Sequence, residues 1–217
     1  MKKLIFFLYP FFLYANYSDS GPHEVVISVD NFTLSSGQSI EYTFFTPAEI
    51  NHITQVTLVH AFSRNMDSYY ELAEHYASWG LGVVTMNLLY SSIFENDPLQ
   101  DAIDLKEVSD YFSDGRPVLY VGHSSGAMRA IVAATEDTNA IAILGLDLTD
   151  GAYENSDGEF LGLTYARISS IPIWGLLAEP SSCNANGNGI NVYLEAEHGN
   201  AISISAVSYT HLRAHET

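Results

Sequence analysis

One short stretch constrains the fold of this chain more than any other. An apolar run, PVLYV at 117–121, is followed by GHSSG at 122–126 and then by the helix-forming run AMRAIVAA. The first run predicts a buried strand and the last run a helix. A strand that turns into a helix this abruptly needs small residues where the backbone segments approach each other, and Gly122 and Gly126 supply them. Ser124 is therefore expected at the tip of a sharp turn.

The pattern G-x-S-x-G between a strand and a helix is typical of a serine nucleophile. The N-terminus of the following helix points toward the reacting oxygen, where its partial positive charge stabilises an oxyanion. Ser124 is the predicted nucleophile. His123 precedes it, and we expect its ring to pack against the fold rather than to act as the base.

Strand and helix patterns alternate along the rest of the chain. The predicted strands are 24–29, 40–45, 55–59, 82–86, 117–121, 140–146, 172–178 and 201–206, and the predicted helices are 65–79, 99–112 and 127–134. Such alternation favours an α/β fold with a mainly parallel sheet. The two strands that come before the first helix predict an antiparallel start. At 217 residues, the chain is long enough for one domain with a substantial core.

Ligands of such sheets bind at the carboxyl ends of the strands. The stretch His60-Ala61-Phe62-Ser63 directly follows the predicted strand QVTLV. A second donor for an oxyanion comes from the loop after an earlier strand in proteins with this turn. The backbone N–H groups of Phe62 and Ser125 are therefore the predicted oxyanion hole.

A serine nucleophile of this type is followed in the chain by an acid and then by a histidine. Asp147 comes directly after the predicted strand 140–146, and we prefer it as the acid. Asp150 and Glu179 stay as alternatives. The acidic loop that holds Asp150, Asp157 and Glu159 does not have EF-hand spacing, and the chain has neither H-E-x-x-H nor a cysteine cluster. We expect no metal and no cofactor.

Four stretches together resemble the chlorophyllase and cutinase-like polyester hydrolase branch of the α/β-hydrolases. They are VHAFSRNMDSYYELAEHYASWGLGVV at 59–84, GHSSG, LGLDLTDG at 144–151 and AEPSSCNANGNG at 178–189. The resemblance implies an α/β-hydrolase fold with helices on both faces of the sheet. It also implies hydrolysis of carboxylic esters, of small molecules or of polymers, through an acyl-enzyme on Ser124.

The resemblance also bears on the acid and the base. In chlorophyllase-like proteins the acid lies in a Gly-Ile/Leu-Asp-Pro stretch, which matches Asp147 here, although Leu148 stands where that stretch has proline. The histidine of the family follows the last strand, in a His-Cys stretch that could also hold a partner for Cys183, the single cysteine. We expect the natural histidine to be missing from this chain, together with the natural end of the domain. His211, in the last residues, lies close to that position by accident and is the expected base of the chain as it stands. His198 precedes the strand and is the weaker alternative.

Both ends of the chain carry segments that we do not expect to belong to the domain. Residues 1–17 have two lysines, an apolar run and a small residue, as a secretory signal peptide does, and the run is too short for a stable membrane span. This predicts a secreted or periplasmic protein. Residues 207–217, VSYTHLRAHET, resemble a translated sequencing adapter. The hydrolase domain is then expected over 18–206, incomplete at its C-terminus.

Charge and the uncertain base limit the functions to consider. The chain has 26 acidic and 8 basic side chains, a formal net charge of -18, which argues against nucleic acid as a partner. If neither His198 nor His211 reaches Ser124, the hydroxyl has no base and the chain would be nearly inactive. The alternative function is therefore a non-catalytic binding protein with a hydrolase fold.

Overall fold

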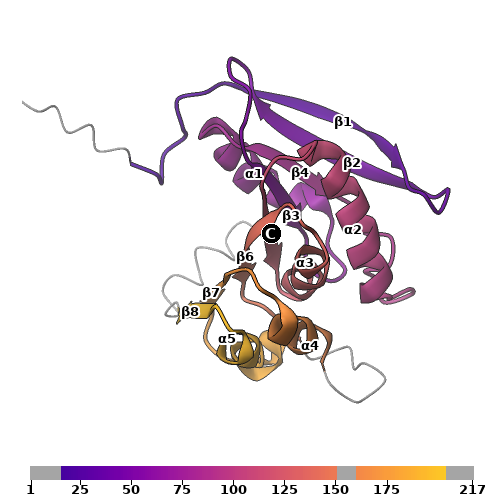
Figure 1. The fold of residues 1–217 in the computed structure, drawn as a ribbon, viewed down its shortest axis with the longest axis vertical. Coiled ribbons are helices and arrows are strands. Elements are labelled where there is room, and N and C mark those ends of the chain that lie inside the picture. The colour runs from indigo at the N-terminus through magenta and orange to yellow at the C-terminus, as the bar shows by residue number, and fades with distance from the viewer. Residues whose placement is uncertain (1–15, 151–159, 204–217) are drawn as a thin grey trace, which may run out of the picture.

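The computed structural model describes residues 16–150 and 160–203, and the most extensive feature in this part of the chain is an eight-stranded sheet. The strand order is β1-β2-β4-β3-β5-β6-β7-β8. Strand β2 is antiparallel to β1 and β4, and the other neighbours are parallel. The predicted mainly parallel sheet with an antiparallel start is confirmed. The hairpin of β1 and β2 forms one end of the molecule (Figure 1).

The predicted strands are present, with shifts at their ends. They are β1 Val25–Thr33, β2 Ser39–Pro47, β3 Gln55–Val59, β4 Gly82–Met86, β5 Val118–His123, β6 Ala140–Leu146, β7 Ile173–Leu177 and β8 Gly199–Ser203. The last strand begins two residues before its predicted start at 201. Residues 204–206 of that prediction lie outside the described part of the chain, as do residues 1–15 and 207–217.

The helices differ more from the prediction. Residues 65–79 form a 3-10 turn, η1 (Met66–Tyr69), and then α1 (Tyr70–Ser78). The other two predicted helices are α2 (Pro98–Ser113) and α3 (Ser125–Thr135). Three further elements were not predicted from the sequence: α4 (Leu161–Ile168), η2 (Ser182–Gly187) and α5 (Ile190–Glu195). The unpredicted elements have six to eight residues each, which is too short for an apolar period to be distinguished from that of a strand or a loop.

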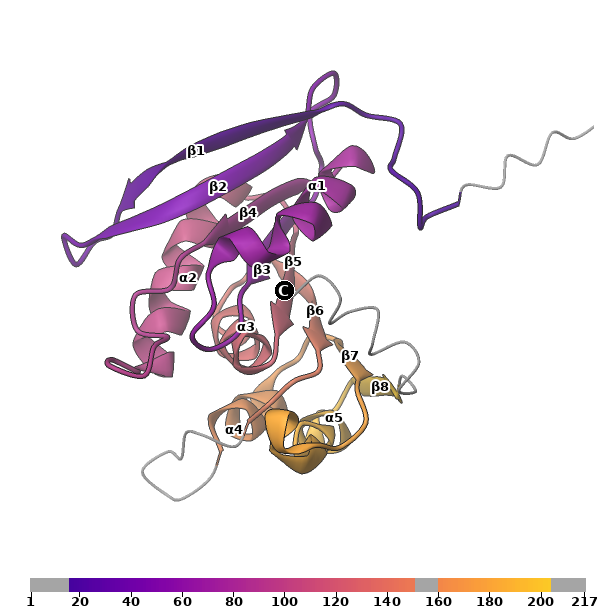
Figure 2. The same cartoon turned by 180° about the vertical axis from the view of Figure 1, so that it is seen from behind.

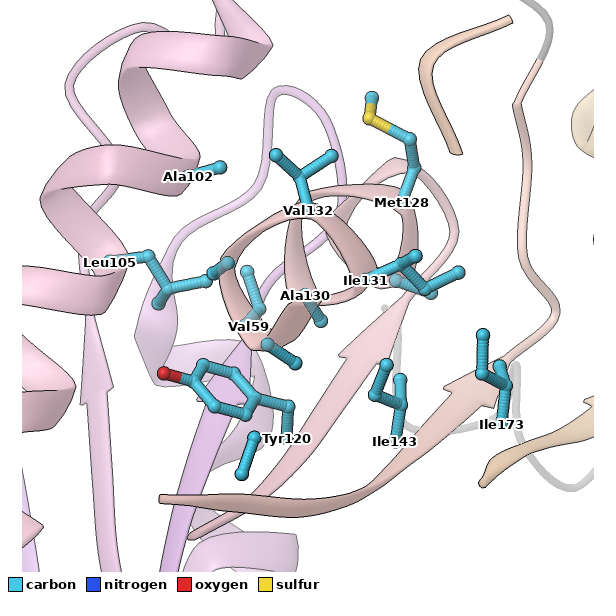
Figure 3. Close-up of a cluster of buried hydrophobic side chains, with 14 of the residues drawn as sticks. Val59, Ala102, Leu105, Tyr120, Met128, Ala130, Ile131, Val132, Ile143 and Ile173 are labelled. Carbon is cyan, nitrogen blue, oxygen red and sulfur yellow. The ribbon is translucent and has the colours of Figure 1, made fainter. Parts of the chain in front are cut away.

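Helices cover both faces of the sheet, as expected. Helix α1 packs on one face with Val56, Leu58 and Val121, and Figure 2 shows it beside β3 and β4. The opposite face packs against α2, α3, α4 and α5. In Figure 3, α3 lies beside α2 and above the strands, with Ile131 above Ile143 and Ile173. Burial of α3 on nearly all sides keeps the helix after the turn in one position.

On the α1 face, the far end of the sheet is less covered. Trp174 of β7 is 49% exposed and Ile202 of β8 is 61% exposed, although both are large apolar side chains. Among residues 16–150 and 160–203, no helix is long and apolar enough to cross a membrane.

A fully buried ion pair joins α2 to α3. Arg129 Nε donates to Asp101 Oδ2 at 2.8 Å, and both side chains are 0% exposed. The guanidinium also donates to the carbonyl of Ser125 at 3.3 Å and to Asn96 Oδ1 at 3.1 Å. Asp101 Oδ1 accepts the N–H of Tyr90 at 2.9 Å. This network ties the first turn of α3 to the loop between β4 and α2.

Replacing Arg129 by methionine should lower the free energy of unfolding by about 3–5 kcal/mol, because the carboxylate of Asp101 stays buried without its cation. The double variant Arg129→Met/Asp101→Leu should recover most of that loss, since no unpaired charge remains. Urea unfolding of the three proteins measures both effects. A single variant as stable as the original would show that the pair does not hold the two helices together.

Candidate active site

Ser124 lies in a strained backbone conformation between β5 and α3. Its φ is 53° and its ψ is -125°, a region that costs a non-glycine residue about 1–3 kcal/mol. A Cβ at Gly126 would lie 2.8 Å from the carbonyl oxygen of Val59 and would also strike the carbonyl of His60. A Cβ at Gly122 would lie 2.6 Å from Ala127. The predicted strand, turn and helix are therefore present, and both glycines are required by close backbone contacts.

The hydroxyl of Ser124 points toward the loop that follows β6. Its Oγ donates to Thr149 Oγ1 at 3.3 Å, which is long for a bond between two hydroxyl groups. Its backbone N–H donates to the carbonyl of Leu146 at 2.9 Å. The serine is half-buried and is held against the end of the neighbouring strand.

The N–H groups of Phe62 and Ser125 are the oxyanion donors that the sequence analysis predicts. The close contact of Gly126 with the carbonyls of Val59 and His60 brings the end of β3 against the first turn of α3. The N–H of Ser125 lies in that first turn, where backbone N–H groups have no acceptor within the helix. The N–H of Phe62 donates to no described residue. Neither N–H group is therefore bonded to an acceptor among the described residues.

The peptide that carries the Phe62 N–H is held by its carbonyl end. The oxygen of Ala61 accepts the N–H of Arg64 at 3.1 Å and hydrogen bonds with Nδ1 of His60 at 2.8 Å. A trans peptide is planar, so fixing the C=O of Ala61 also fixes the direction of the Phe62 N–H on its opposite side. The sequence placed His60 beside the oxyanion hole and did not reveal this role.

His60 is buried in its neutral form. Its Nε2 accepts the N–H of Leu88 at 3.0 Å, so Nδ1 carries the proton and donates to Ala61. Burial lowers the pKa of His60 to about 4; the hydrogen bond to Ala61 opposes this shift, and the charge of Arg129 adds to it. A second proton would remove the acceptor that Leu88 needs.

Asp147 follows β6, and its carboxylate reaches the end of β7. Its Oδ1 accepts the N–H of Ala178, the residue just after β7, at 3.1 Å. Its own N–H donates to the carbonyl of Leu176 at 2.7 Å. The backbone of Asp147 has φ 49°, another left-handed conformation. The preferred acid therefore lies one strand away from Ser124, since His123 and Leu146 are paired in register.

Asn184 was missed by the sequence analysis and makes more contacts to Asp147 than any other described side chain. Its Nδ2 donates to Asp147 Oδ1 at 3.1 Å and Oδ2 at 3.4 Å, and to the carbonyl of Glu179 at 3.1 Å. Its Oδ1 accepts the backbone N–H groups of Ser181 and Gly187. It is 1% exposed. The sequence signal for this residue was the Asn-rich stretch at 178–189. That stretch does not reveal the partner, because Asp147 lies 37 residues away in the chain.

The two alternative acids have other contacts. Asp150 Oδ1 and Oδ2 accept the N–H groups of Gly162 and Leu163 at 2.9 and 2.8 Å, so its carboxylate caps α4. Burial raises the pKa of Asp150 to about 6 despite these two bonds. Glu179 lies beyond the end of β7, and its carbonyl accepts from Asn184.

The histidines are placed as follows. His123 Nδ1 lies 2.7 Å from the hydroxyl of Tyr69, so the ring makes a specific hydrogen bond in addition to packing.

The carbonyl of His198 accepts the N–H of Ile173 at the start of β7, which puts His198 at the amino end of β8. Ser124 lies at the other end of the parallel strands, at their carboxyl ends, and a strand of five residues spans about 16 Å between the two ends. His211 lies outside the described residues. Within the described ranges, no group of three His, Cys, Asp or Glu residues could hold a metal ion.

Comparison with known proteins identifies the fold. The sequence matches no protein-family model and no curated protein. The structure is similar to the esterase domain of a Rhodothermus marinus protein, with a TM-score of 0.63 at 16% identity over 83% of this chain and 87% of that chain. The chain has the α/β-hydrolase fold.

Two further α/β-hydrolase-like structures support that assignment. An alpha/beta hydrolase from Penicillium sp. has a TM-score of 0.66 at 13% identity, covering 88% of this chain and 99% of that one. A cold-adapted esterase from an Arctic intertidal metagenomic library has a TM-score of 0.66 at 12% identity, covering 84% and 85%. At these identities the likeness establishes the α/β-hydrolase fold and not a reaction.

The buried His60 of this α/β-hydrolase fold predicts a pH effect on stability. The pKa of His60 is about 4 in the folded protein and 6.5 in the unfolded chain, so the folded state binds fewer protons between these values. The stabilisation is complete above pH 6.5 and is lost as the pH falls to 4, by up to about 3 kcal/mol. Urea unfolding at several pH values should show this slope.

His60→Gln is the matched variant, because the Gln carbonyl can still accept the N–H of Leu88 but does not titrate. Its free energy of unfolding should depend less on pH between 6.5 and 4 than that of the original protein. Equal slopes in the two proteins would mean that His60 does not become protonated on unfolding.

Proposed function

We propose that this protein is a serine hydrolase that cleaves carboxylic esters. The observation that carries the proposal is the strained turn at Ser124, between a strand and a helix. The proposed oxyanion donors are the N–H groups of Phe62 and Ser125, which donate to no described residue. Strain of this kind persists only where the surrounding structure enforces it, and it is concentrated at functional sites. No cofactor is needed for this chemistry.

The proposed reaction has two halves. Oγ of Ser124 attacks the acyl carbon while its proton passes to a histidine base, and the N–H groups of Phe62 and Ser125 stabilise the negative oxygen of the tetrahedral intermediate. The intermediate collapses, the alcohol leaves with the proton, and an acyl-enzyme remains on Ser124. Water then attacks the acyl carbon with the same groups assisting, and Ser124 and the free acid are restored.

The proposed base is His211, which follows the last strand. Support for this choice comes from β8, which runs parallel to β7. The chain therefore leaves β8 at the carboxyl ends of the strands, where Ser124 and Asp147 also lie. His198 enters the strand at the other edge. The proposed acid is Asp147, because its carboxylate lies at the end of β7 and not at a helix N-terminus, as that of Asp150 does.

Exposed apolar side chains beside the oxyanion loop support an apolar ester as substrate. The carbonyl of Ser91 accepts the N–H of Ser63 at 2.8 Å, which joins the loop after β4 to the loop after β3. In the same loop, Ile93 is 76% exposed and Phe94 is 93% exposed. The proposed substrate is a small or polymeric ester, and the proposed family is the chlorophyllase and cutinase-like branch. We also propose that residues 1–17 direct export to a secreted or periplasmic location.

A second candidate function is a non-catalytic binding protein with the same fold. The observation that favours it is the partner of Ser124 Oγ, which among residues 16–150 and 160–203 is the neutral hydroxyl of Thr149 and not an imidazole. A serine bonded only to another hydroxyl is a weak nucleophile. The two functions make opposite predictions for labelling of Ser124.

Ser124 should react with a fluorophosphonate, and mass mapping should find the label on that residue alone. Replacing Ser124 by alanine should abolish labelling and lower the turnover of p-nitrophenyl butyrate at least about 10³-fold, because the attacking oxygen is gone. Ser28→Ala, on the exposed strand β1, is the control and should label as the original protein does. Turnover that survives in Ser124→Ala would overturn the proposal, and a folded chain that neither labels nor turns over would favour the binding protein.

Asn184→Ala should reduce ester turnover through the position of Asp147. Loss of the amide removes two hydrogen bonds from the carboxylate, and a small misplacement of catalytic groups costs up to about 10²-fold in rate. The effect should be on kcat more than on KM, since Asn184 does not contact the substrate in this proposal. Ser182→Ala, an exposed residue of the same 3-10 turn, should keep full activity. Equal kinetics of the Asn184 and Ser182 variants would argue against Asp147 as the acid.

A further inference from the structure

Tyr69 connects the two halves of the site. Its hydroxyl oxygen lies 2.7 Å from Nδ1 of His123 and accepts the backbone N–H of Ala61 at 3.2 Å. His123 is the residue before Ser124, and Ala61 is the residue before Phe62. One phenol group therefore contacts both the strand that ends at the nucleophile and the loop that carries an oxyanion donor.

The hydrogen bond between Tyr69 and His123 has a donor and an acceptor, and the other bond of the phenol bears on which is which. We assign the hydroxyl proton of Tyr69 to Nδ1 of His123, an arrangement in which the phenol oxygen also accepts the N–H of Ala61. Nδ1 then acts as the acceptor and Nε2 carries the ring proton. The tilted rings of Tyr69 and His123, with centroids 5.9 Å apart, add contact between the two side chains.

The loop after β3 and the turn between β5 and α3 both need such support, because each contains a residue in a left-handed conformation. Ser63 has φ 54° and Ser124 has φ 53°. Beyond Phe62, the loop is anchored by the bond from the N–H of Ser63 to the carbonyl of Ser91 and, at its end, by the bond from the N–H of Met66 to Asn87 Oδ1. Before Phe62, the N–H of Ala61 is bonded only to Tyr69 among the described residues.

We propose that Tyr69 is a positioning residue that, through His123 and Ala61, fixes the oxyanion loop against the nucleophile turn. The proposal rests on the proposed function for its consequence in catalysis. Its structural half, the anchoring of Ala61, is measurable without any turnover.

Amide hydrogen exchange and imidazole nitrogen NMR test the structural half. In the original protein, His123 should show an unprotonated Nδ1, and the Ala61 amide should be protected. In Tyr69→Phe, which keeps the ring and loses the hydroxyl, Ala61 should exchange at least about tenfold faster, because its acceptor is gone. The Ser63 amide, bonded to Ser91, should keep its protection and serves as the internal control.

Tyr70→Phe is the matched control variant. It removes the neighbouring phenol, whose oxygen lies 2.7 Å from Thr43 Oγ1, and it should leave the exchange of Ala61 unchanged. His123→Asn keeps a carbonyl acceptor near the position of Nδ1 and should protect Ala61 better than His123→Leu. An unchanged Ala61 amide in Tyr69→Phe, or equal exchange in the two His123 variants, would overturn the proposal.

The rate of fluorophosphonate labelling tests the catalytic half. Tyr69→Phe should label Ser124 about tenfold more slowly than the original protein, with His123→Asn closer to the original than His123→Leu. The double variant Tyr69→Phe/His123→Leu should be no slower than the slower single variant, because both act through one chain of hydrogen bonds. If the original protein does not label, the proposed function fails, and the exchange of Ala61 still decides whether Tyr69 holds the loop.

Discussion

A close backbone contact between the end of β3 and the first turn of α3 determines the geometry of the whole site. Only a residue without a side chain fits at Gly126, where a Cβ would meet the carbonyls of Val59 and His60. The same approach brings the start of the loop after β3 against the first turn of α3, directly after Ser124, whose backbone is in a left-handed conformation. The large apolar surface of α3, buried against α2 and the sheet, holds the helix against this strain (Figure 3).

The second half of the site depends on contacts between two loops that are distant in sequence. Asn184 and Gly189, from the stretch after β7, close on the loop after β6: the amide binds Asp147, and a Cβ at Gly189 would lie 2.8 Å from the carbonyl carbon of Leu148. The sheet makes this possible, because neighbouring parallel strands end at the same edge. A carboxylate that follows β6 in sequence thereby lies at the end of β7.

Buried and half-buried polar side chains support the loop after β3 and the turn at Ser124. His60 fixes the peptide of Phe62 from one side, and Tyr69 joins that loop to His123. Arg129 pairs with Asp101 beneath the first turn of α3. Each of these groups exchanges water for a specific partner, so losing one partner leaves a buried polar atom unsatisfied. The site is therefore sensitive to substitutions at residues that need not touch a substrate.

The sequence by itself determined the elements whose signal is local. Alternating apolar strands and helices, and glycines around Ser124, predicted the α/β fold, the nucleophile turn and the region of Phe62 and Ser125, because periodicity and close packing are encoded within a few neighbouring residues. Only the tertiary structure decided the hydrogen-bond partners of Asp150, Asn184, His123 and Tyr69. An aspartate that caps a helix and an aspartate held at a strand end have the same local sequence signal. They differ in partners that the sheet brings together across 12 residues for Asp150 and Gly162, and 37 for Asp147 and Asn184.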